Sequence, residues 1–168
     1  MVLFWFNNLA ALDFEALMAV YKEGNALNGS LQYPNDSPVR QKFLAERDFE
    51  DYLRQIFFCQ EGAAYCVFSE NGTYISAVRI EPFEDGYLLS GLETKPDCRR
   101  RGYGKRLIES LILECTEKRK LPIYSHVKNK NIASINLHLE CGFRVYKDSA
   151  RYLDGSVRTD SKTLIYEK

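Results

Sequence analysis

Apolar residues recur along this chain with two different spacings, which predict strands in some segments and helices in others. Alternation of apolar and polar residues, and short runs rich in β-branched and aromatic residues, indicate strands. Apolar residues three or four positions apart indicate amphipathic helices. The strand-like segments are residues 2–6, 64–69, 74–80, 87–94, 123–127, 143–146 and 163–166, and the helix-like segments are residues 10–22, 40–60, 107–120 and 132–141.

Turn residues connect these segments into a mixed sheet. Asn71-Gly72 predicts a hairpin between the second and third strands, and residues 84–86 (Glu-Asp-Gly) predict the next turn. The strand, helix and strand between residues 87 and 127 form a unit whose two strands we expect to be parallel. Gly91, inside an otherwise bulky strand, occupies a position that is typical of a β-bulge.

Two further segments are predicted to be irregular. Residues 24–38 are rich in Gly, Asn, Ser and Pro and are expected to form a loop. Asp154-Gly155 is expected to turn the chain between the last two strands. Asp13 is a plausible start for the first helix, because a carboxylate accepts hydrogen bonds from the free N–H groups of a helix N-terminus.

Composition favours a single folded domain, residues 1–168, and argues against several classes of protein. Of the 168 residues, 45% are hydrophobic and 27% are charged, with a formal net charge of zero. A nucleic-acid binder would show a basic excess, so we interpret the basic run at residues 99–106 as a local anion site. The five cysteines form no metal-like cluster and predict reduced thiols in a cytoplasm. The apolar start of the chain has no basic flank, and we expect neither a signal peptide nor a membrane span.

The strongest chemical signal lies at residues 95–108, where a strand leads through a basic, glycine-containing loop into a helix. Free N–H groups at a helix N-terminus attract anions, and Gly102 and Gly104 would let phosphate oxygens approach the backbone. A P-loop requires Ser or Thr after its Lys, but Arg106 follows Lys105. A dinucleotide fingerprint requires a third glycine, but Leu107 stands there. The loop therefore predicts a phosphate or pyrophosphate site of another kind.

Two motifs together resemble the GNAT superfamily of acyl-CoA-dependent N-acetyltransferases. The first is Arg99-x-x-Gly102-x-Gly104 after a strand and before an amphipathic helix. The second runs from Asn131 to Gly142-Phe143, with His138 where the family usually has a tyrosine. The resemblance implies an α/β (α+β) fold in which about four helices flank a mixed, centrally splayed sheet of six to seven strands.

The resemblance also implies that acetyl-CoA is the co-substrate, with no metal. Its pyrophosphate would lie on the amides of the basic loop, its pantetheine would pair like a strand with the backbone near Leu92, and Asn131 would bond a pantetheine amide. The cofactor-binding residues implied in this way are Leu92, Thr94, Arg99, Arg100, Arg101, Gly102, Tyr103, Gly104, Lys105, Asn131 and Ser134.

Three residues are candidates for the proton chemistry. Helical spacing places His138 on the same side as Asn131 and Ser134, so we expect it to face the thioester as general acid, with Ile132 and Leu139 on the core side. His126 lies in the next strand, where some relatives carry a glutamate base. Glu93, which flanks the expected thioester position, is the alternative base.

The function that the sequence favours is transfer of an acetyl group to a primary amine of a small molecule or peptide. A non-catalytic acyl-CoA-binding or sensor module is the alternative, because the tyrosine is replaced. A nucleic-acid interaction domain is the third hypothesis. The acceptor stays open, although Glu81, Glu84 and Asp85 could attract a cationic amine; a homodimer is also left open.

Overall fold

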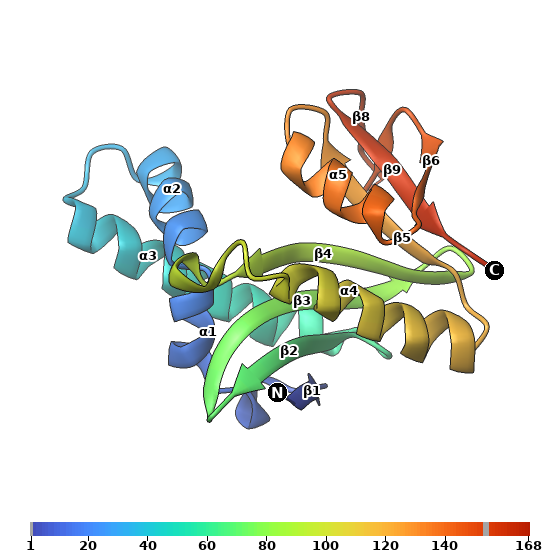
Figure 1. Ribbon diagram of the computed structural model, residues 1–168. Helices are drawn as coiled ribbons and strands as arrows, with labels where there is room; N and C mark the ends of the chain where they lie inside the picture. Colours follow the sequence, from blue (N-terminus) through green and yellow to red (C-terminus); the bar gives the residue numbers. More distant parts are fainter. Residues whose placement is uncertain (1, 153–154) are drawn as a thin grey trace.

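The computed structural model describes residues 2–152 and 155–168 and contains a seven-stranded sheet (Figure 1). The strand order is β1-β2-β3-β4-β5-β9-β6, and every pair is antiparallel except β4 with β5. Short strands β7 and β8 form a separate pair. The strands are β1 (Val2–Phe6), β2 (Ala64–Glu70), β3 (Thr73–Phe83), β4 (Gly86–Thr94), β5 (Ile123–Lys128), β6 (Arg144–Lys147), β7 (Ala150–Arg151), β8 (Val157–Arg158) and β9 (Ser161–Tyr166).

Helices cover both faces of the sheet and divide the core into two main clusters. Apolar residues of α1 and α3 pack on one face, against Tyr65, Val67 and Ala77. Apolar residues of α4 and of the α5 region pack on the other face, against Cys66, Val78 and their neighbours. The α-helices are α1 (Phe14–Val20), α2 (Lys22–Gln32), α3 (Pro38–Gln55), α4 (Tyr103–Leu111) and α5 (Ile132–Glu140). A π-helical segment, Ile112–Lys118, continues α4.

The central splay is confirmed by the pairing of β4 with β5. Only Tyr87, Leu88 and Leu89 of β4 pair with β5, at Ile123–Ser125, although both strands continue beyond this point. Figure 1 shows the two strands diverging, so that β5, α5 and β9 stand away from β1–β4. The sheet is therefore open in its middle while it stays closed at one end.

The β-bulge predicted at Gly91 is also present. The β3–β4 register shifts so that Ala77 pairs with Glu93 while Arg79 pairs with Ser90, which leaves one extra residue in β4. Gly91 has a φ of +63°, and the hydroxyl of Tyr21 donates a hydrogen bond to its carbonyl oxygen. The bulge returns Glu93 to the same face as Ser90, and Leu92 faces the other side.

The prediction that residues 24–38 form a loop was wrong for most of this segment. Residues 22–32 form α2, which packs tightly against α3. A Cβ at Gly29 would lie 2.5 Å from the carbonyl oxygen of Gln41, so only glycine permits this contact. The close packing of the helices therefore overrides the low helix propensity of the Gly and Asn residues.

The other predicted elements are present with shifted ends. Asp13 caps α1 by accepting a hydrogen bond from Ala16 N, as expected. The segment predicted as one helix at residues 10–22 contains a short 3-10 turn, Leu9–Ala11, before α1. Asp154, part of the turn predicted near the C-terminus, lies outside the described residues.

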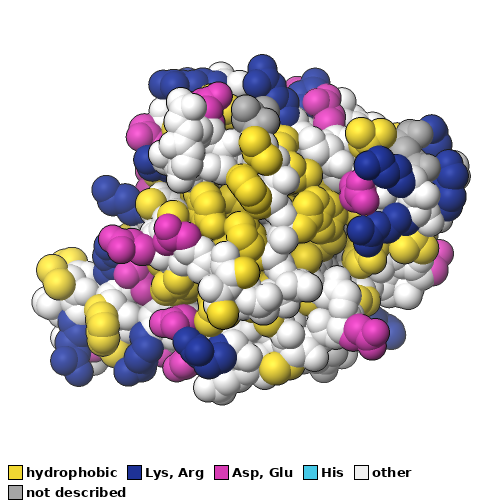
Figure 2. Space-filling view, turned by 90° about the horizontal axis from the view of Figure 1, so that it is seen from below, with side chains coloured by type: hydrophobic (Ala, Val, Ile, Leu, Met, Phe, Trp, Pro, Cys, Tyr) yellow, Lys and Arg dark blue, Asp and Glu magenta, His cyan; other side chains and the backbone are white. Residues whose placement is uncertain are grey.

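The sheet ends at β1, whose outer edge is unpaired among the described strands. Figure 2 shows the molecule from below, the side on which β1 lies in Figure 1, with hydrophobic side chains across its middle and charged ones around them. Val2 and Phe4 of β1 are 55% and 43% exposed.

Within residues 2–152 and 155–168, no helix has the length and apolar character needed to cross a bilayer.

Candidate active site

A cleft of about 650 Å³, which we call the loop cleft, opens between the end of β4, the start of α4 and one side of α5. Ten of the residues predicted to bind the cofactor line it. Arg101, the other predicted residue, is exposed and does not. The ten are Leu92, Thr94, Arg99, Arg100, Gly102, Tyr103, Gly104, Lys105, Asn131 and Ser134.

The loop after β4 presents free backbone groups to this cleft. Arg100 and Gly102 have positive φ angles of +62° and +79°, and Gly102 directly precedes α4. None of the described side chains caps this helix, and the N–H groups of its first turn lack partners within it. Together with the positive end of the helix dipole, they make the loop cleft suitable for a phosphate group.

Two basic side chains of the loop cleft are already paired with carboxylates. The guanidinium of Arg99 donates to the carbonyl oxygen of Thr94 (3.1 Å) and lies 2.5 Å from Glu23 and 3.5 Å from Glu93. Lys105 lies 3.9 Å from Glu140. Arg99 therefore links the loop to α2 and to β4 as well as lining the cleft.

Asn131 is the N-cap of α5. Its side-chain oxygen accepts a hydrogen bond from the backbone N–H of Ser134 at 3.1 Å, which leaves the side-chain NH₂ as a donor. Since both residues line the loop cleft, Asn131 can combine a structural role with a contact to a ligand.

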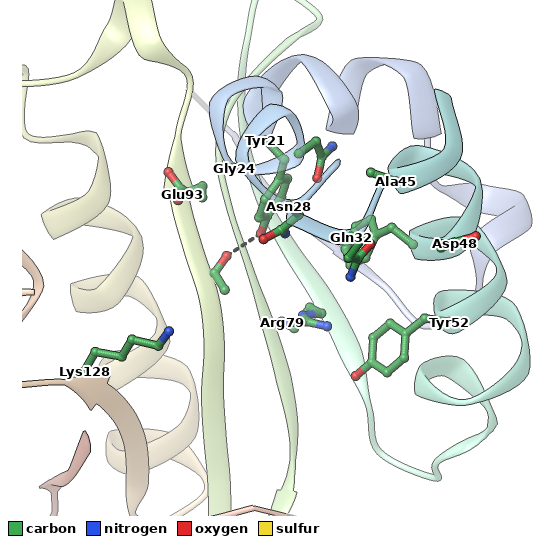
Figure 3. Close-up of a pocket in the computed structure, with 13 residues that line it drawn as sticks. Tyr21, Gly24, Asn28, Gln32, Ala45, Asp48, Tyr52, Arg79, Glu93 and Lys128 are labelled. Atoms are coloured by element: carbon green, nitrogen blue, oxygen red, sulfur yellow. Dashed lines mark hydrogen bonds between the residues drawn. The ribbon is translucent and has the colours of Figure 1, made fainter. Parts of the chain in front are cut away.

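A second hollow, which we call the β3 groove, lies on the opposite face of β4. It has two adjoining parts of about 630 and 750 Å³ that share Tyr52, Arg79 and Gly91. Figure 3 shows the first part, with Tyr52 and Gln32 on the helical side and Glu93 and Lys128 on the strands. The second part extends along β4 to His126 and Tyr152.

Glu93 lines both the loop cleft and the β3 groove. It lies in the part of β4 that has separated from β5, so the two hollows meet at the opening of the sheet. Burial raises the pKa of its carboxyl group, and the nearby Arg99 guanidinium opposes this shift. A carboxylate with a raised pKa is a better proton acceptor near neutral pH.

His126 faces the β3 groove from β5. Its ring lies edge-on to Phe83 and Tyr152, at centroid distances of 5.3 and 5.2 Å. Neither ring nitrogen has a hydrogen-bond partner among the described residues. Burial lowers the pKa of the imidazole, which keeps it neutral and able to accept a proton.

The predicted orientation of His138 was wrong. Its side chain is only 2% exposed and does not line the loop cleft, while Ile132 and Leu139, predicted to face the core, are 59% and 44% exposed. The ring packs edge-on against Phe143, and Nδ1 lies 2.7 Å from the Ser134 carbonyl oxygen. Helix α5 is thus rotated relative to the prediction, and a catalytic role for His138 stays a prediction without support from its position.

The acidic residues considered for the acceptor separate in the structure. Glu81 is buried and lines the β3 groove. Glu84 pairs with Lys147, and Asp85 accepts a hydrogen bond from the Tyr124 hydroxyl. Of the three, only Glu81 lines this groove.

Sequence reasoning missed Arg79 and Tyr21, both of which line the β3 groove. Arg79 had a signal that could have been used, because it is the one charged residue inside the apolar run of residues 74–80. Tyr21 had none, since its bond to Gly91 joins residues 70 positions apart.

The comparisons with known proteins agree with this architecture. The structure is similar to the PaiA N-acetyltransferase of Thermoplasma acidophilum in complex with coenzyme A (TM-score 0.67, 14% identity, 100% of both chains). It is also similar to the ribosomal-protein-S18-alanine N-acetyltransferase of Escherichia coli (TM-score 0.60, 22% identity, 99% of this chain and 94% of that one). A third similar structure, an Elizabethkingia anophelis GNAT acetyltransferase with acetyl-CoA bound, has a TM-score of 0.52 and 16% identity over 63% of this chain and 76% of that one. At these identities, the likeness shows the fold.

No curated protein matches the sequence. The sequence model of the acetyltransferase (GNAT) family, however, matches residues 31–143, more than half of the chain. This match includes β4, the basic loop, α4, β5 and α5, which together surround the loop cleft. The chain therefore belongs to the acetyltransferase (GNAT) family.

Proposed function

We propose that this protein transfers an acetyl group from acetyl-CoA directly to a primary amine. The observation that carries the proposal is the meeting of the loop cleft and the β3 groove at Glu93, where β4 and β5 separate. A thioester in one hollow and an amine in the other would approach each other through this opening. CoA or acetyl-CoA is bound in two of the similar structures, which supports the same co-substrate here.

In this proposal, the loop cleft binds the CoA part of the co-substrate. The free N–H groups at the start of α4 donate hydrogen bonds to the pyrophosphate, and Lys105 adds positive charge. The edge of β4 that faces β5 is unpaired beyond Leu89 and pairs with the pantetheine arm, and the Asn131 side-chain NH₂ donates to one of its amides. Arg101 does not line the cleft, so its contact with the pyrophosphate stays a prediction from the sequence.

The amine nitrogen attacks the thioester carbonyl carbon and forms a tetrahedral oxyanion. Backbone N–H groups of the separated end of β4 stabilise that charge. As the C–S bond breaks, the nitrogen loses its proton to Glu93, whose raised pKa suits it for this role. The products are an acetamide and CoA. His126 is the alternative base, since it lines the β3 groove with two unpaired nitrogens.

One observation favours the alternative of an acyl-CoA-binding module without catalysis. His138 stands where the family usually has a tyrosine, and its side chain is buried in the core. No proton donor from that position therefore reaches the loop cleft. Since the CoA thiolate is a fairly good leaving group, we favour catalysis without this donor.

Two measurements separate these functions. Calorimetry with acetyl-CoA tests binding, and release of free CoA in the presence of a broad panel of primary amines tests transfer. We expect binding in the first and amine-dependent release, with an acetylated product detected by mass spectrometry, in the second. Tight binding with no amine-dependent release across the panel would support the binding module instead.

A further inference from the structure

The β3 groove contains a guanidinium group that no described carboxylate contacts directly, although the charge of the nearby Glu81 acts on it. Arg79 lines both parts of this groove. Its Cζ atom lies 5.6, 5.2 and 5.8 Å from the ring centroids of Phe49, Tyr52 and Phe57. These distances are within the range of cation–π contacts, so three aromatic rings hold the guanidinium in place.

The aromatic rings leave the hydrogen-bonding capacity of Arg79 unused. Its Nε atom is buried and has no acceptor, and no described residue forms an ion pair or a hydrogen bond with this side chain. Arg79 is half-buried, and its Nε lacks the hydrogen bond that a buried polar atom usually makes. An arginine fork matches a carboxylate well, because two parallel N–H groups fit its two oxygens.

Arg79 also lies beside the opening of the sheet. A Cβ built on Gly91 would lie 3.2 Å from its Nη2 atom. Gly91 forms the bulge next to Leu92, and Leu92 lines the loop cleft on the other face. A group bound by Arg79 is therefore only a short distance from the place where the amine meets the thioester.

From these contacts we propose that the acceptor is an amino-carboxylic acid whose carboxylate is bound by Arg79. The proposal rests on the proposed function and names its substrate class. The carboxylate lies within a few bonds of the amine, because Arg79 lies next to the bulge.

Glu81 adds a second contact to the same ligand. It lies two residues from Arg79 on the same face of β3, is 5% exposed, and lines the β3 groove. One carboxylate oxygen accepts a hydrogen bond from Ser90 at 3.3 Å, while the other has no partner. This free oxygen accepts a hydrogen bond from the acceptor's N–H or from another donor on the ligand.

The first experiment measures binding and does not depend on turnover. Calorimetry on the CoA-saturated protein compares the N-acetyl derivatives of the standard amino acids that have a primary amine, the products of the proposed reaction, each with its C-terminal amide. We expect at least one acid to bind about 10²-fold more tightly than its amide, the usual order for a buried charge pair. Arg79→Met should remove this preference, because Met fills the aromatic cage without the charge.

Two further variants sharpen the result. Arg79→Lys keeps the charge but loses the two-pronged contact, so its preference for the acid should be intermediate. Arg40→Met removes an exposed arginine of α3 that pairs with Asp36, and it should retain the full preference. Acetyl-CoA affinity and melting temperature, measured for every variant, control for damage to the fold.

Equal binding of acids and amides across the panel, or an acid preference that survives in Arg79→Met, would overturn this assignment. CoA release with free amino acids then reports separately on catalysis. Acid-selective binding without any release would refute the proposed transferase activity while supporting the Arg79 site. Amine-dependent CoA release without any preference for acids in binding would support the transferase activity and refute the Arg79 site.

Discussion

The two hollows that meet at Glu93 are built in different ways. In the loop cleft, residues 92–105 contribute most of the lining from one continuous stretch, and the backbone supplies the anion-binding groups. In the β3 groove, the lining comes from α2, α3, β3, β4 and β5 together with Tyr21 and Tyr152, and side chains supply the chemistry. A site made of backbone binds a constant chemical group, whereas a site made of side chains can change its ligand by substitution. The co-substrate can thus be predicted from a short sequence motif, whereas the acceptor cannot.

The largest expected effect comes from Glu93, the residue that joins the two hollows. Glu93→Gln should lower kcat by about 10²- to 10⁴-fold, the usual range for losing a general base. The wild-type rate should fall as pH falls through the carboxyl pKa, and this fall should begin at a higher pH than for an ordinary carboxylate, because burial raises that pKa. Steady-state kinetics against a verified amine, from pH 5 to 9, would test both points.

Acetyl-CoA affinity provides the control for this variant, because Gln keeps the size of the side chain. The acetyl-CoA affinity of Glu93→Gln should therefore differ little from that of the wild type. If Glu93→Gln retains wild-type kcat, the base is assigned wrongly, and the matched variant His126→Gln becomes the next test.

The next largest effect is expected from a substitution that impairs CoA binding in the loop cleft and leaves the β3 groove unchanged. Gly104→Asp should weaken CoA binding by about 10²-fold or more, because a carboxylate would face the pyrophosphate. Gly104→Ala is the matched control. Its Cβ would lie 3.4 Å from Thr94 Oγ1 and 3.5 Å from Leu137 Cδ2, which are ordinary contacts, so the fold should be kept. Without the added charge, CoA affinity should fall much less than in Gly104→Asp. Calorimetry with CoA distinguishes the two, and equal affinities would refute the loop assignment.

His138 belongs to the core beneath the loop cleft, and its removal should mainly affect stability. His138→Ala should lower the free energy of unfolding by about 2–4 kcal/mol, the range for a cavity left by a large buried side chain. Chemical denaturation measures this loss. A fully stable His138→Ala protein with a greatly reduced kcat would instead restore the acid role predicted from sequence.

The same residue makes stability depend on pH. Burial lowers the pKa of His138 in the folded state, while the unfolded chain titrates near the ordinary value of about 6.5. Below that pH the unfolded state binds a proton that the folded state does not, so stability falls as pH falls. His138→Leu should reduce the slope of unfolding free energy against pH in the range below about pH 6.5. An unchanged slope would show that His138 does not contribute.

The smallest expected effect concerns the shape of the β3 groove. Tyr21→Phe removes the hydroxyl that bonds to the Gly91 carbonyl oxygen at the bulge. The loss should cost about 1 kcal/mol in unfolding free energy, as is typical of one hydrogen bond. We expect the KM for the amine to rise a few-fold while CoA affinity stays constant. A change in CoA affinity instead of the amine KM would show that the bulge shapes the loop cleft.

Local sequence was sufficient for those parts of the protein that depend on neighbouring residues. The Asn71-Gly72 hairpin, the Asp13 helix cap and the basic loop before α4 each follow from the properties of a few adjacent residues. The parallel pairing of β4 with β5 also followed, because a strand–helix–strand unit allows few other arrangements. The loop cleft was predictable for the same reason.

Tertiary packing decided what local patterns left open. Helix α2 forms because Gly29 allows close contact with α3, a gain that its composition does not reveal. His138 is buried because α5 turns Ile135 and Cys141 toward the core, although Ile132 and Leu139 are equally apolar. The aromatic cage around Arg79 brings together α3, the following turn and β3. Contacts between distant segments set each of these features, so the β3 groove became visible only in the folded chain.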